Sequence, residues 1–481
     1  MEHSENNRCH WSAFLPALRK KALNEAVGSV FFKNQALNRW LRETLDGTTG
    51  KDLSQRLLGD PVFEATFAWK SSSKTFRKLG EEGLFSREAL AAFGDKYASA
   101  HPYRHQLEAF SRLLDRNRRN SVILSSGTGS GKTECFMMPL IGELAREWRG
   151  SSQKRQGVRA LFLYPLNALI ESQKQRLRAW TKPFEGRFKF CLYNGDLVEK
   201  DRPRGAALKT SEEVISRQEM REEYVPDMLL TNPSMLERML LRQSDRPILE
   251  KTRRARCFRW VIIDEAHTYI GTKAADLALL IRRVLNAFGV SANDVHFVAT
   301  SATVDASDEE AKAALRRFLI DLSGADESRV HLILGARKIP SATSLPEGED
   351  ATLEDLRRAA DDDGPAGLWA RLMDSPTAVR IRNAFITTPV HALRLSELQR
   401  ITGVRDEEEL LGWIDLLTAS KHSDLPLRFH QMFNTTGALR VCPDPNCPEK
   451  TGALKHPEWR FGAVWLDGRE KCGCGHPARY H

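Results

Sequence analysis

Residues 126–133, with the sequence SGTGSGKT, place glycines, a lysine and a threonine at the spacing of a phosphate-binding loop. Glycines allow backbone N–H groups to curl around phosphate oxygens at a helix N-terminus. Lys132 would neutralise the β- and γ-phosphates of ATP, and the Thr133 hydroxyl would coordinate Mg²⁺. The other residues expected around the phosphates are Ser126, Gly127, Thr128, Gly129, Ser130 and Gly131. Taken alone, the segment could also be a glycine-rich turn between a strand and a helix.

Two adjacent acids end the apolar run of RWVIIDEAH, residues 259–267. Asp264 can hold Mg²⁺ opposite Thr133, and Glu265 can orient and deprotonate an attacking water. Asp-Glu pairs are common on solvated turns, but this pair ends a predicted buried strand. The combination of loop and acids therefore predicts ATP binding and hydrolysis with Mg²⁺.

These residues need a sheet to position them, and residues 101–340 supply its pattern. Short runs that are apolar throughout alternate with helical stretches, which indicates an α/β domain whose parallel sheet is covered on both faces. The runs are SVILSS (121–126), VRALFLY (158–164), FKFCLYN (188–194), DMLLT (227–231), WVIIDE (260–265), VHFVATSAT (295–303) and VHLILGA (330–336).

GTGSGKT, DEAH at 264–267 and SAT at 301–303, in that order, resemble the first three motifs of superfamily 2 helicases. The resemblance implies that residues 101–340 are a first RecA-like, ATP-binding domain. It also implies that His267 links hydrolysis to nucleic-acid binding, and that Ser301 and Thr303 bridge the two ATP motifs. The position before the first loop glycine is small in this family, so Ser126 fits it.

Upstream of the loop, PYRHQ (102–106) is similar to the motif with which these helicases read adenine. Gln106 can meet the adenine edge with an amide donor and acceptor, and Tyr103 can stack on the ring. Without the phosphate loop 26 positions later, Gln106 could equally well be an ordinary surface residue.

Three loops resemble the segments with which these helicases hold the backbone of one nucleic-acid strand. They are YPLNAL (164–169), YNGD (193–196) and TNPSML (231–236), each after a predicted strand on the same edge of the sheet. Each alone fits an ordinary strand-to-helix loop. The residues expected to contact nucleic acid are Pro165, Asn167, Gly195, Asp196, Thr231, Asn232 and Pro233. Basic runs at 116–119 and 251–259 add either phosphate contacts or solvated surface.

Four cysteines crowd the C-terminus, as Cys442-x4-Cys447 and Cys472-x-Cys474. Two cysteine pairs can complete a tetrahedral thiolate Zn²⁺ site. His476, or a cysteine beyond the chain, is an alternative fourth ligand. The other alternative is that the four cysteines are reduced and bind no metal. His430 fits a packing role better than a ligand role.

Composition places the chain among globular proteins of two or three domains, with 481 residues and 41% hydrophobic residues. Lys and Arg exceed Asp and Glu by 72 to 63, which suits a polyanionic partner. We find neither a signal peptide nor an apolar stretch long enough for a membrane span, and expect a cytoplasmic protein without a membrane partner. The expected parts are a mainly helical N-terminal accessory region (1–100), the RecA-like domain (101–340), an acidic linker (341–367), a small helical region (368–425) and a zinc module (426–481).

Longer matches, among them YPLNALIESQ and IDEAHTYIGTKAADLALLIRR, are similar to the large bacterial helicases related to mitomycin repair factor A and the Druantia anti-phage helicase. The resemblance implies an ATP-dependent DNA helicase or translocase in DNA repair or antiviral defence. The pattern Q-x-x-G-R-x-G-R of a second RecA-like domain is not found. We therefore expect slow hydrolysis by this chain alone, which would then be a natural fragment, a truncated record, or one gene of a split motor whose second RecA-like domain is carried by a separate chain. The alternatives are a non-catalytic nucleotide- and DNA-binding subunit, and an RNA helicase.

Overall fold

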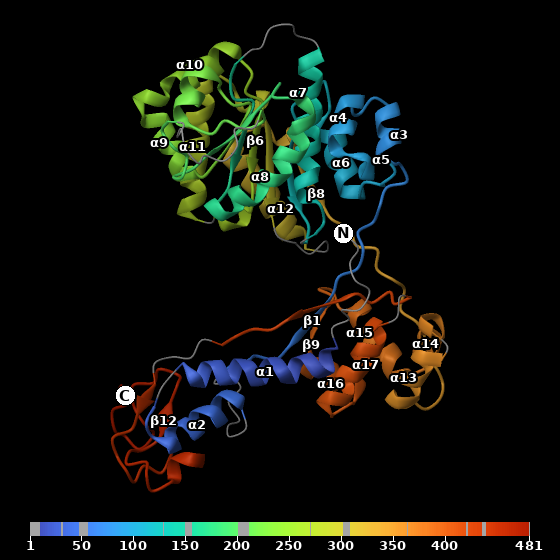
Figure 1. The fold of residues 1–481 in the computed structure, drawn as a ribbon, viewed down its shortest axis with the longest axis vertical. Coiled ribbons are helices and arrows are strands. Elements are labelled where there is room, and N and C mark those ends of the chain that lie inside the picture. The colour runs from blue at the N-terminus through green and yellow to red at the C-terminus, as the bar shows by residue number, and fades with distance from the viewer. Residues whose placement is uncertain are drawn as a thin grey trace. The chain divides into compact units, whose positions relative to one another are not determined.

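The computed structural model describes residues 10–29, 32–47, 56–127, 129–149, 156–200, 211–269, 271–301, 308–362, 364–419, 422–434 and 439–480. The chain forms two compact units (Figure 1). Trp69–Lys338 are one, here termed the sheet unit. Met1–Ala68 and Ile339–His481 together are the other, termed the split unit.

A seven-stranded parallel sheet, in the order β4-β5-β3-β6-β7-β2-β8, forms the centre of the sheet unit. It confirms the predicted α/β class with a parallel sheet. The strands are β2 (Ser121–Ser125), β3 (Ala160–Leu163), β4 (Phe190–Tyr193), β5 (Met228–Thr231), β6 (Trp260–Ile263), β7 (His296–Ser301) and β8 (Val330–Leu334).

Alternate strand residues feed two hydrophobic cores, one on each face of the sheet. Phe162 and Ile262 pack in the core of α3 (Phe76–Glu81), α4 (Arg87–Phe93), α5 (Asp95–Ala98), α6 (Arg104–Leu113), α7 (Lys132–Arg149) and α8 (Asn167–Thr181). Leu161 and Val261 pack in the core of α9 (Pro233–Leu241), α10 (Arg246–Ala255), α11 (Thr272–Phe288) and α12 (Glu309–Ser323). Polar side chains are therefore confined to the two edges where strands begin and end. No helix in the described part of the chain is long and apolar enough to cross a membrane.

The two ends of the sheet unit lie side by side. The backbone N–H of Lys70 donates to the carbonyl of Ala336 at 2.9 Å. Next to this bond, the Arg337 guanidinium lies over the Trp69 ring, 3.6 Å from its centroid.

The split unit joins segments from both ends of the chain. β1 (Val62–Ala65) lies between β9 (Ala392–Arg394) and β10 (Leu427–His430) in an antiparallel sheet. The first turn of α1 (Trp11–Gly28) is fixed to α17 (Glu407–Ala419), because the backbone N–H of Trp11 donates to Asp415 at 2.6 Å.

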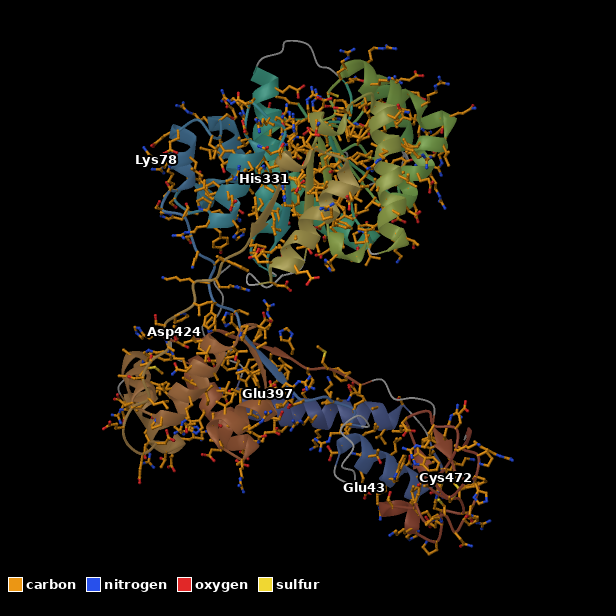
Figure 2. All side chains as sticks on the ribbon, turned by 180° about the vertical axis from the view of Figure 1, so that it is seen from behind. Glu43, Lys78, His331, Glu397, Asp424 and Cys472 are labelled. Carbon is orange, nitrogen blue, oxygen red and sulfur yellow. The ribbon has the colours of Figure 1, made fainter. Side chains whose placement is uncertain are left out.

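Four further helices complete this core: α13 (Leu353–Asp362), α14 (Gly364–Met373), α15 (Pro376–Thr387) and α16 (Leu395–Thr402). Arg382 on α15 holds the carboxylate of Asp424, which is labelled in Figure 2, through two hydrogen bonds of 2.9 and 2.6 Å. α13 lies inside the acidic segment 341–367, and its Leu356 is fully buried.

The cysteine-containing end has its own small core. α2 (Gln35–Asp46) packs through Leu37 and Trp40 against the three-stranded sheet of β11 (Arg440–Val441), β12 (Val464–Trp465) and β13 (Arg479–Tyr480), and against the 3-10 turn η8 (Gly452–Lys455). The N-terminal segment thus supplies part of the support for the cysteines.

A buried histidine at the amino edge of the main sheet is held neutral by its partners. Arg119 Nη1 lies 3.0 Å from His296 Nε2, and a guanidinium can only donate, so Nε2 accepts. His296 Nδ1 therefore carries the hydrogen and donates to the Asn120 carbonyl at 2.7 Å. Burial lowers the pKa of His296 to about 4, although Glu143 lies nearby.

Acid should therefore destabilise the sheet unit through His296. Below its unfolded pKa the unfolded chain binds the proton and the folded chain does not, so stability falls from about pH 6.5 to pH 4. The loss is on the order of 3 kcal/mol. Urea unfolding across this range should show a weaker pH dependence for His296→Asn, but not for the exposed control His101→Asn. Equal pH slopes for wild type and His296→Asn would contradict the assignment.

Candidate nucleotide and nucleic-acid site

The loop from Ser126 to Gly131 runs from the carboxyl end of β2 to the first turn of α7. Gly129 and Gly131 take φ values of 72° and 70°, a region in which other residues are strained. A Cβ on Gly131 would lie 2.3 Å from the amide nitrogen of Gln106, so α6 packs directly on the loop. Thr128 lies outside the described residues.

Hydrogen bonds across the loop hold its ends together. Lys132 Nζ donates to the carbonyl of Ser126 at 2.6 Å, and the hydroxyls of Ser126 and Ser130 lie 2.6 Å apart. Both serines are buried, whereas Lys132 is half-buried. Ser126, the small residue before the first loop glycine, is thus a structural part of the loop, with its side chain turned inward.

A pocket of about 490 Å³ opens beside the loop. Its lining contains every predicted nucleotide residue except the buried Ser126 and the undescribed Thr128. The lining residues are Phe76, Tyr97, Ala100, His101, Tyr103, Gln106, Gly127, Gly129, Ser130, Gly131, Lys132, Thr133, Glu134 and Arg176.

Gln106 and His105 tie α6 to the loop. The Gln106 amide accepts from the backbone N–H of Tyr103 at 2.9 Å and donates to the Gly131 carbonyl at 3.2 Å. His105 Nε2 donates to the Ser130 carbonyl at 2.8 Å, and its ring stacks on Tyr103. Burial is the main cause that lowers the pKa of His105, and the positive charge of Lys132 lowers it further. His105 was not singled out from the sequence, because its role depends on this contact with a distant loop.

The two acids follow β6 at the same edge. Glu265 sits in a left-handed conformation with φ 50°, and its carboxylate lies 3.3 Å from Nδ1 of the exposed His267. Thr300, near the end of the neighbouring strand β7, fixes both acids. Its hydroxyl donates to the Asp264 carboxylate and accepts from the backbone N–H of Glu265 at 3.0 Å.

Thr300 is the residue that the sequence motifs missed, since it directly precedes SAT. Ser301 of that motif is buried beside Ser125, its register partner on β2, and Thr303 lies outside the described residues. β7 separates β6 from β2, so the acids and the phosphate loop are about 10 Å apart across two strand spacings. That gap suits a Mg²⁺ ion held between Asp264 and Thr133.

A larger groove of about 1610 Å³ lies along the same edge and is termed the carboxyl-edge groove. It brings together Pro165, Asn167, Gly195, Asn232 and Pro233 from the three predicted loops. Thr231 is buried beneath it and donates to the Tyr193 carbonyl, whereas Asp196 is exposed outside the lining.

Contacts between the loops shape this groove. Asn232 donates to the side chain of Asn167 at 2.9 Å and accepts from the backbone N–H of Met235, so it caps α9. Helices α9 and α11 add Arg238, Lys273, Arg282 and Arg283, which were not among the residues predicted to contact nucleic acid. Glu237 and Asp276 also line the groove, and Glu237 pairs with Arg283 at 2.9 Å. The groove therefore carries a small excess of basic side chains beside helix N-terminal loops, which suits a sugar-phosphate backbone.

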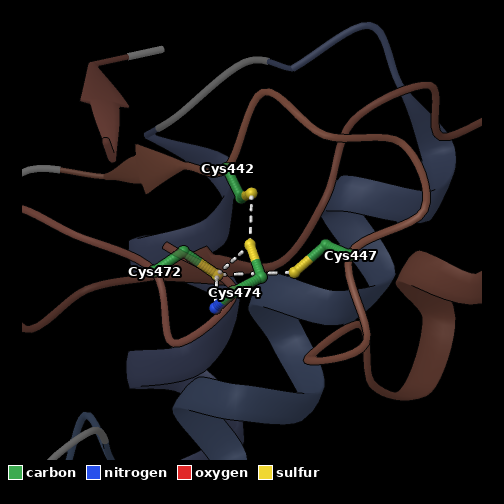
Figure 3. Close-up of side chains that lie close together, drawn as sticks. All are labelled: Cys442, Cys447, Cys472 and Cys474. Atoms are coloured by element: carbon green, nitrogen blue, oxygen red, sulfur yellow. Dashed lines mark hydrogen bonds between the residues drawn. The ribbon is translucent and has the colours of Figure 1, made fainter. Parts of the chain in front are cut away.

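In the split unit, four cysteine sulfurs converge (Figure 3). All lie within 4.8 Å of one another, with Cys442 and Cys474 sulfurs 3.5 Å apart and those of Cys447 and Cys472 3.4 Å apart. Zn–S bonds of about 2.3 Å in a tetrahedron place sulfurs about 3.8 Å apart, so the donor set fits zinc.

The pKa values of these thiols are shifted in opposite directions. Burial raises the pKa of Cys442 to about 11, whereas hydrogen bonds with His476 lower the pKa of the half-buried Cys474 to about 6. His476 Nδ1 lies 3.3 Å from the Cys474 sulfur, outside the four-sulfur cluster. His430 pairs with Glu64 on β1 at 2.7 Å and takes no part in the cluster.

The phosphate loop, the strand-end acids and the parallel sheet together define a nucleotide-binding domain of the helicase type. A sequence profile of the DEAD/DEAH box helicases matches residues 103–311. This stretch of the chain therefore resembles the DEAD/DEAH box helicases of superfamily 2.

Three curated relatives share part of its sequence. Druantia protein DruE of Escherichia coli (strain UMEA 4076-1) is 28% identical over 356 residues, which cover 54% of this chain and 19% of DruE. The uncharacterized ATP-dependent helicase YprA of Bacillus subtilis (strain 168) is 28% identical over 235 residues, 48% of this chain and 27% of YprA. ATP-dependent helicase Lhr-Core of Methanothermobacter thermautotrophicus is 25% identical over 252 residues, 50% of this chain and 27% of Lhr-Core. The matches therefore span about a fifth to a quarter of these relatives.

Solved helicase structures show low overall similarity. DUF1998 helicase MrfA bound to DNA has a TM-score of 0.40 and 21% identity, with 73% of this chain and 39% of MrfA covered. The Mycobacterium smegmatis helicase Lhr bound to ssDNA and AMP-PNP has a TM-score of 0.38 and 22% identity, with 59% of this chain and 32% of Lhr covered.

Removal of the Thr300 hydroxyl should weaken the binding of Mg²⁺ at Asp264. In Thr300→Val the Asp264 carboxylate loses a charge-assisted hydrogen bond, which contributes about 1.5–3 kcal/mol. Titration of a fluorescent ATP analogue should show that the affinity gained on adding Mg²⁺ falls roughly tenfold. Thr181→Val, whose hydroxyl bonds only within α8, is the matched control. An unchanged Mg²⁺ effect in Thr300→Val would contradict this role.

Proposed function

We propose that the chain is the ATP-binding part of a DNA helicase or translocase that couples ATP hydrolysis to movement along one strand. One observation carries the proposal: the segment 264–269 belongs to both sites. Asp264 and Glu265 lie at its nucleotide end, and Thr268 and Tyr269 line the carboxyl-edge groove. A displacement at one end of this short turn reaches the other without an intermediary.

In the proposed reaction, Lys132 and the loop N–H groups hold the phosphates of ATP, while Thr133 and Asp264 hold Mg²⁺. Glu265 positions the attacking water and accepts its proton. His267, beside Glu265, links hydrolysis to nucleic-acid binding in the groove. Tyr103 and Gln106, which line the pocket, are proposed to contact the adenine. Ser301 and Thr303 are proposed to couple the two sites.

Nucleic acid would lie across Pro165, Asn167, Gly195, Asp196, Thr231, Asn232 and Pro233. We propose single-stranded DNA, or one strand of a duplex, as the track, since the loops of the groove suit backbone contacts and, among the described residues, we identify no feature that reads a 2′-hydroxyl. Competition between DNA and RNA of the same sequence separates this proposal from an RNA helicase. The proposed role is DNA repair or antiviral defence.

Lys132→Ala should abolish ATPase activity that single-stranded DNA stimulates, because the phosphates lose their cation. A loss of at least about 100-fold is expected in the steady-state rate. The exposed Lys78→Ala is the control for charge removal. ATP binding without any stimulated turnover in the wild-type chain would instead favour the non-catalytic subunit, which acts by docking onto a partner that carries a second RecA-like domain.

We also infer that Cys442, Cys447, Cys472 and Cys474 bind one structural Zn²⁺ ion. Thiolates in tetrahedral geometry are the donors that zinc prefers, and the small core around them contains few large apolar side chains of its own.

The purified chain should contain about one zinc per molecule by metal analysis, and Cys442→Ser should lose it. The same variant should release α2 and β11–β13 to proteolysis, since metal binding and folding of such modules are coupled. Cys191→Ser, at a buried cysteine of the sheet unit, is the control and should keep the zinc. Zinc retained in full by Cys442→Ser, or none in the wild type, would overturn the assignment.

A further inference from the structure

The two basic runs of the sequence, 116–119 and 251–259, meet at one cleft on the amino edge of the main sheet. This arginine cleft measures about 490 Å³ and contains six arginines but only three acids, Asp115, Glu143 and Glu147. The arginines are Arg116, Arg119, Arg146, Arg159, Arg256 and Arg259.

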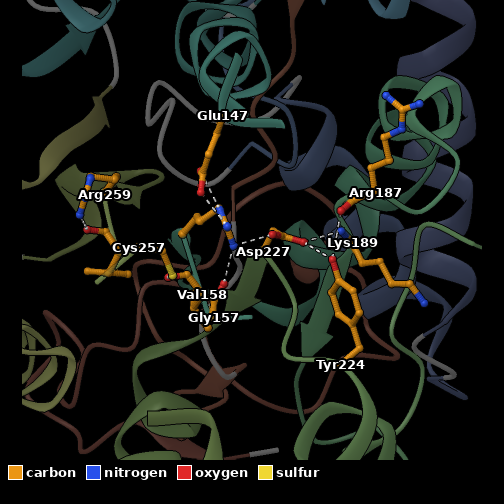
Figure 4. A network of polar contacts seen from close by, with 11 residues as sticks. Glu147, Gly157, Val158, Arg187, Lys189, Tyr224, Asp227, Cys257 and Arg259 are labelled. Carbon is orange, nitrogen blue, oxygen red and sulfur yellow. Dashed lines mark hydrogen bonds and ion pairs between the residues drawn. The ribbon is translucent and has the colours of Figure 1, made fainter. Parts of the chain in front are cut away.

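Two of the six arginines are neutralised within the fold. Arg119 pairs with Glu143 at 2.6 Å. Arg159, only 5% exposed, bonds to Asp227 and Glu147 at 2.8 Å each, and this network continues to Tyr224 and Lys189 (Figure 4). These pairs form the floor of the cleft.

The other four arginines lack such compensation. Among the described residues, no ion pair involves Arg116, Arg146, Arg256 or Arg259. Arg146 and Arg259 donate only to the backbone carbonyls of Gly142 and Phe258. Burial and the nearby charge of Arg116 lower the pKa of Arg146, so the cations lie close enough to repel one another.

Unpaired cations held together cost free energy unless an anion fills the space between them. Guanidinium groups match the oxygens of a phosphate with paired N–H donors. The aromatic ring in the cleft, Trp260, is 1% exposed and donates its N–H to Glu143, so it offers no surface for a base. These features suit a backbone and leave base identity unread.

The geometry points to the phosphodiester backbone of nucleic acid as the occupant of the arginine cleft. The inference rests on the proposed function for its partner, but it concerns a different surface. β2 and β6, of four to five residues, separate the cleft from the phosphate loop and the acids by roughly 15 Å. The cleft would therefore hold a segment of DNA outside the carboxyl-edge groove and leave nucleotide binding untouched.

The test is a salt series of DNA affinities for the full chain and for the triple variant Arg116→Gln, Arg146→Gln, Arg256→Gln. Fluorescence anisotropy with labelled duplex and single-stranded DNA gives the slope of log affinity against log salt. Each lost phosphate contact should reduce that slope by about 0.9, so the triple variant should lose about 2–3. A matched triple variant, Arg77→Gln, Arg87→Gln, Arg405→Gln, removes three exposed charges elsewhere and should keep the wild-type slope. Affinity for a fluorescent ATP analogue should stay the same in both.

A wild-type slope in the cleft variant, with both DNAs, would overturn the inference. The inference would also be overturned if the cleft bound only tripolyphosphate, or if it bound polyglutamate while DNA binding was unaffected. Failure of the proposed function has a different signature: Asn167→Ala would leave DNA affinity unchanged, and single-stranded DNA would not stimulate ATPase activity. In that case the cleft variant could still lose its salt slope, and the two results remain separable.

Discussion

Burial of the parallel sheet on both faces is the constraint on which the chemistry of this chain depends. Strands that are apolar along their whole length leave no room for polar side chains except where they begin and end. Because all seven run in the same direction, every strand-to-helix loop that can hold an anion reaches the same edge. The phosphate loop, the acids and the groove share that edge for one physical reason, and the arginine-rich loops share the other.

Within that edge, the positions of the acids depend on a neighbouring strand. Asp264 and Glu265 end a strand two places from the phosphate loop, and the Thr300 hydroxyl on the strand between them bonds to both. The left-handed backbone at Glu265 turns the chain toward the groove immediately afterwards. Local strain, a cross-strand hydrogen bond and the path to the groove are therefore parts of one arrangement.

The sequence predicted the sheet well, because each strand is a short apolar run between turn residues. It also predicted the glycine loop and the cysteine cluster, whose patterns are local. Contacts between distant segments left no such pattern: Thr300 is one threonine among many, and the two basic runs are far apart in the chain. Residues 353–362 form a helix inside an acidic segment because Leu353, Leu356 and Ala359 recur at helical spacing, a signal that the surrounding charges obscured. Pairing of Phe63 with Leu393 could not be foreseen, since β1 carries few residues and no turn links it to its partners.

The pairing of β1 with β9 depends on the hydrogen bond between Lys70 and Ala336, which brings the two ends of the sheet unit together. The sheet unit, 270 residues from Trp69 to Lys338 (338 − 69 + 1), is an insertion whose two ends emerge together. While it is unfolded, β1 and β9 are the ends of a very long flexible loop, and closing it costs entropy that grows with its length. Once the sheet unit has folded, the bond between Lys70 and Ala336 shortens that loop to residues 66–70 on the side of β1 and residues 336–391 on the side of β9. The folded sheet unit thus lowers the entropic cost of pairing β1 with β9 in the split unit.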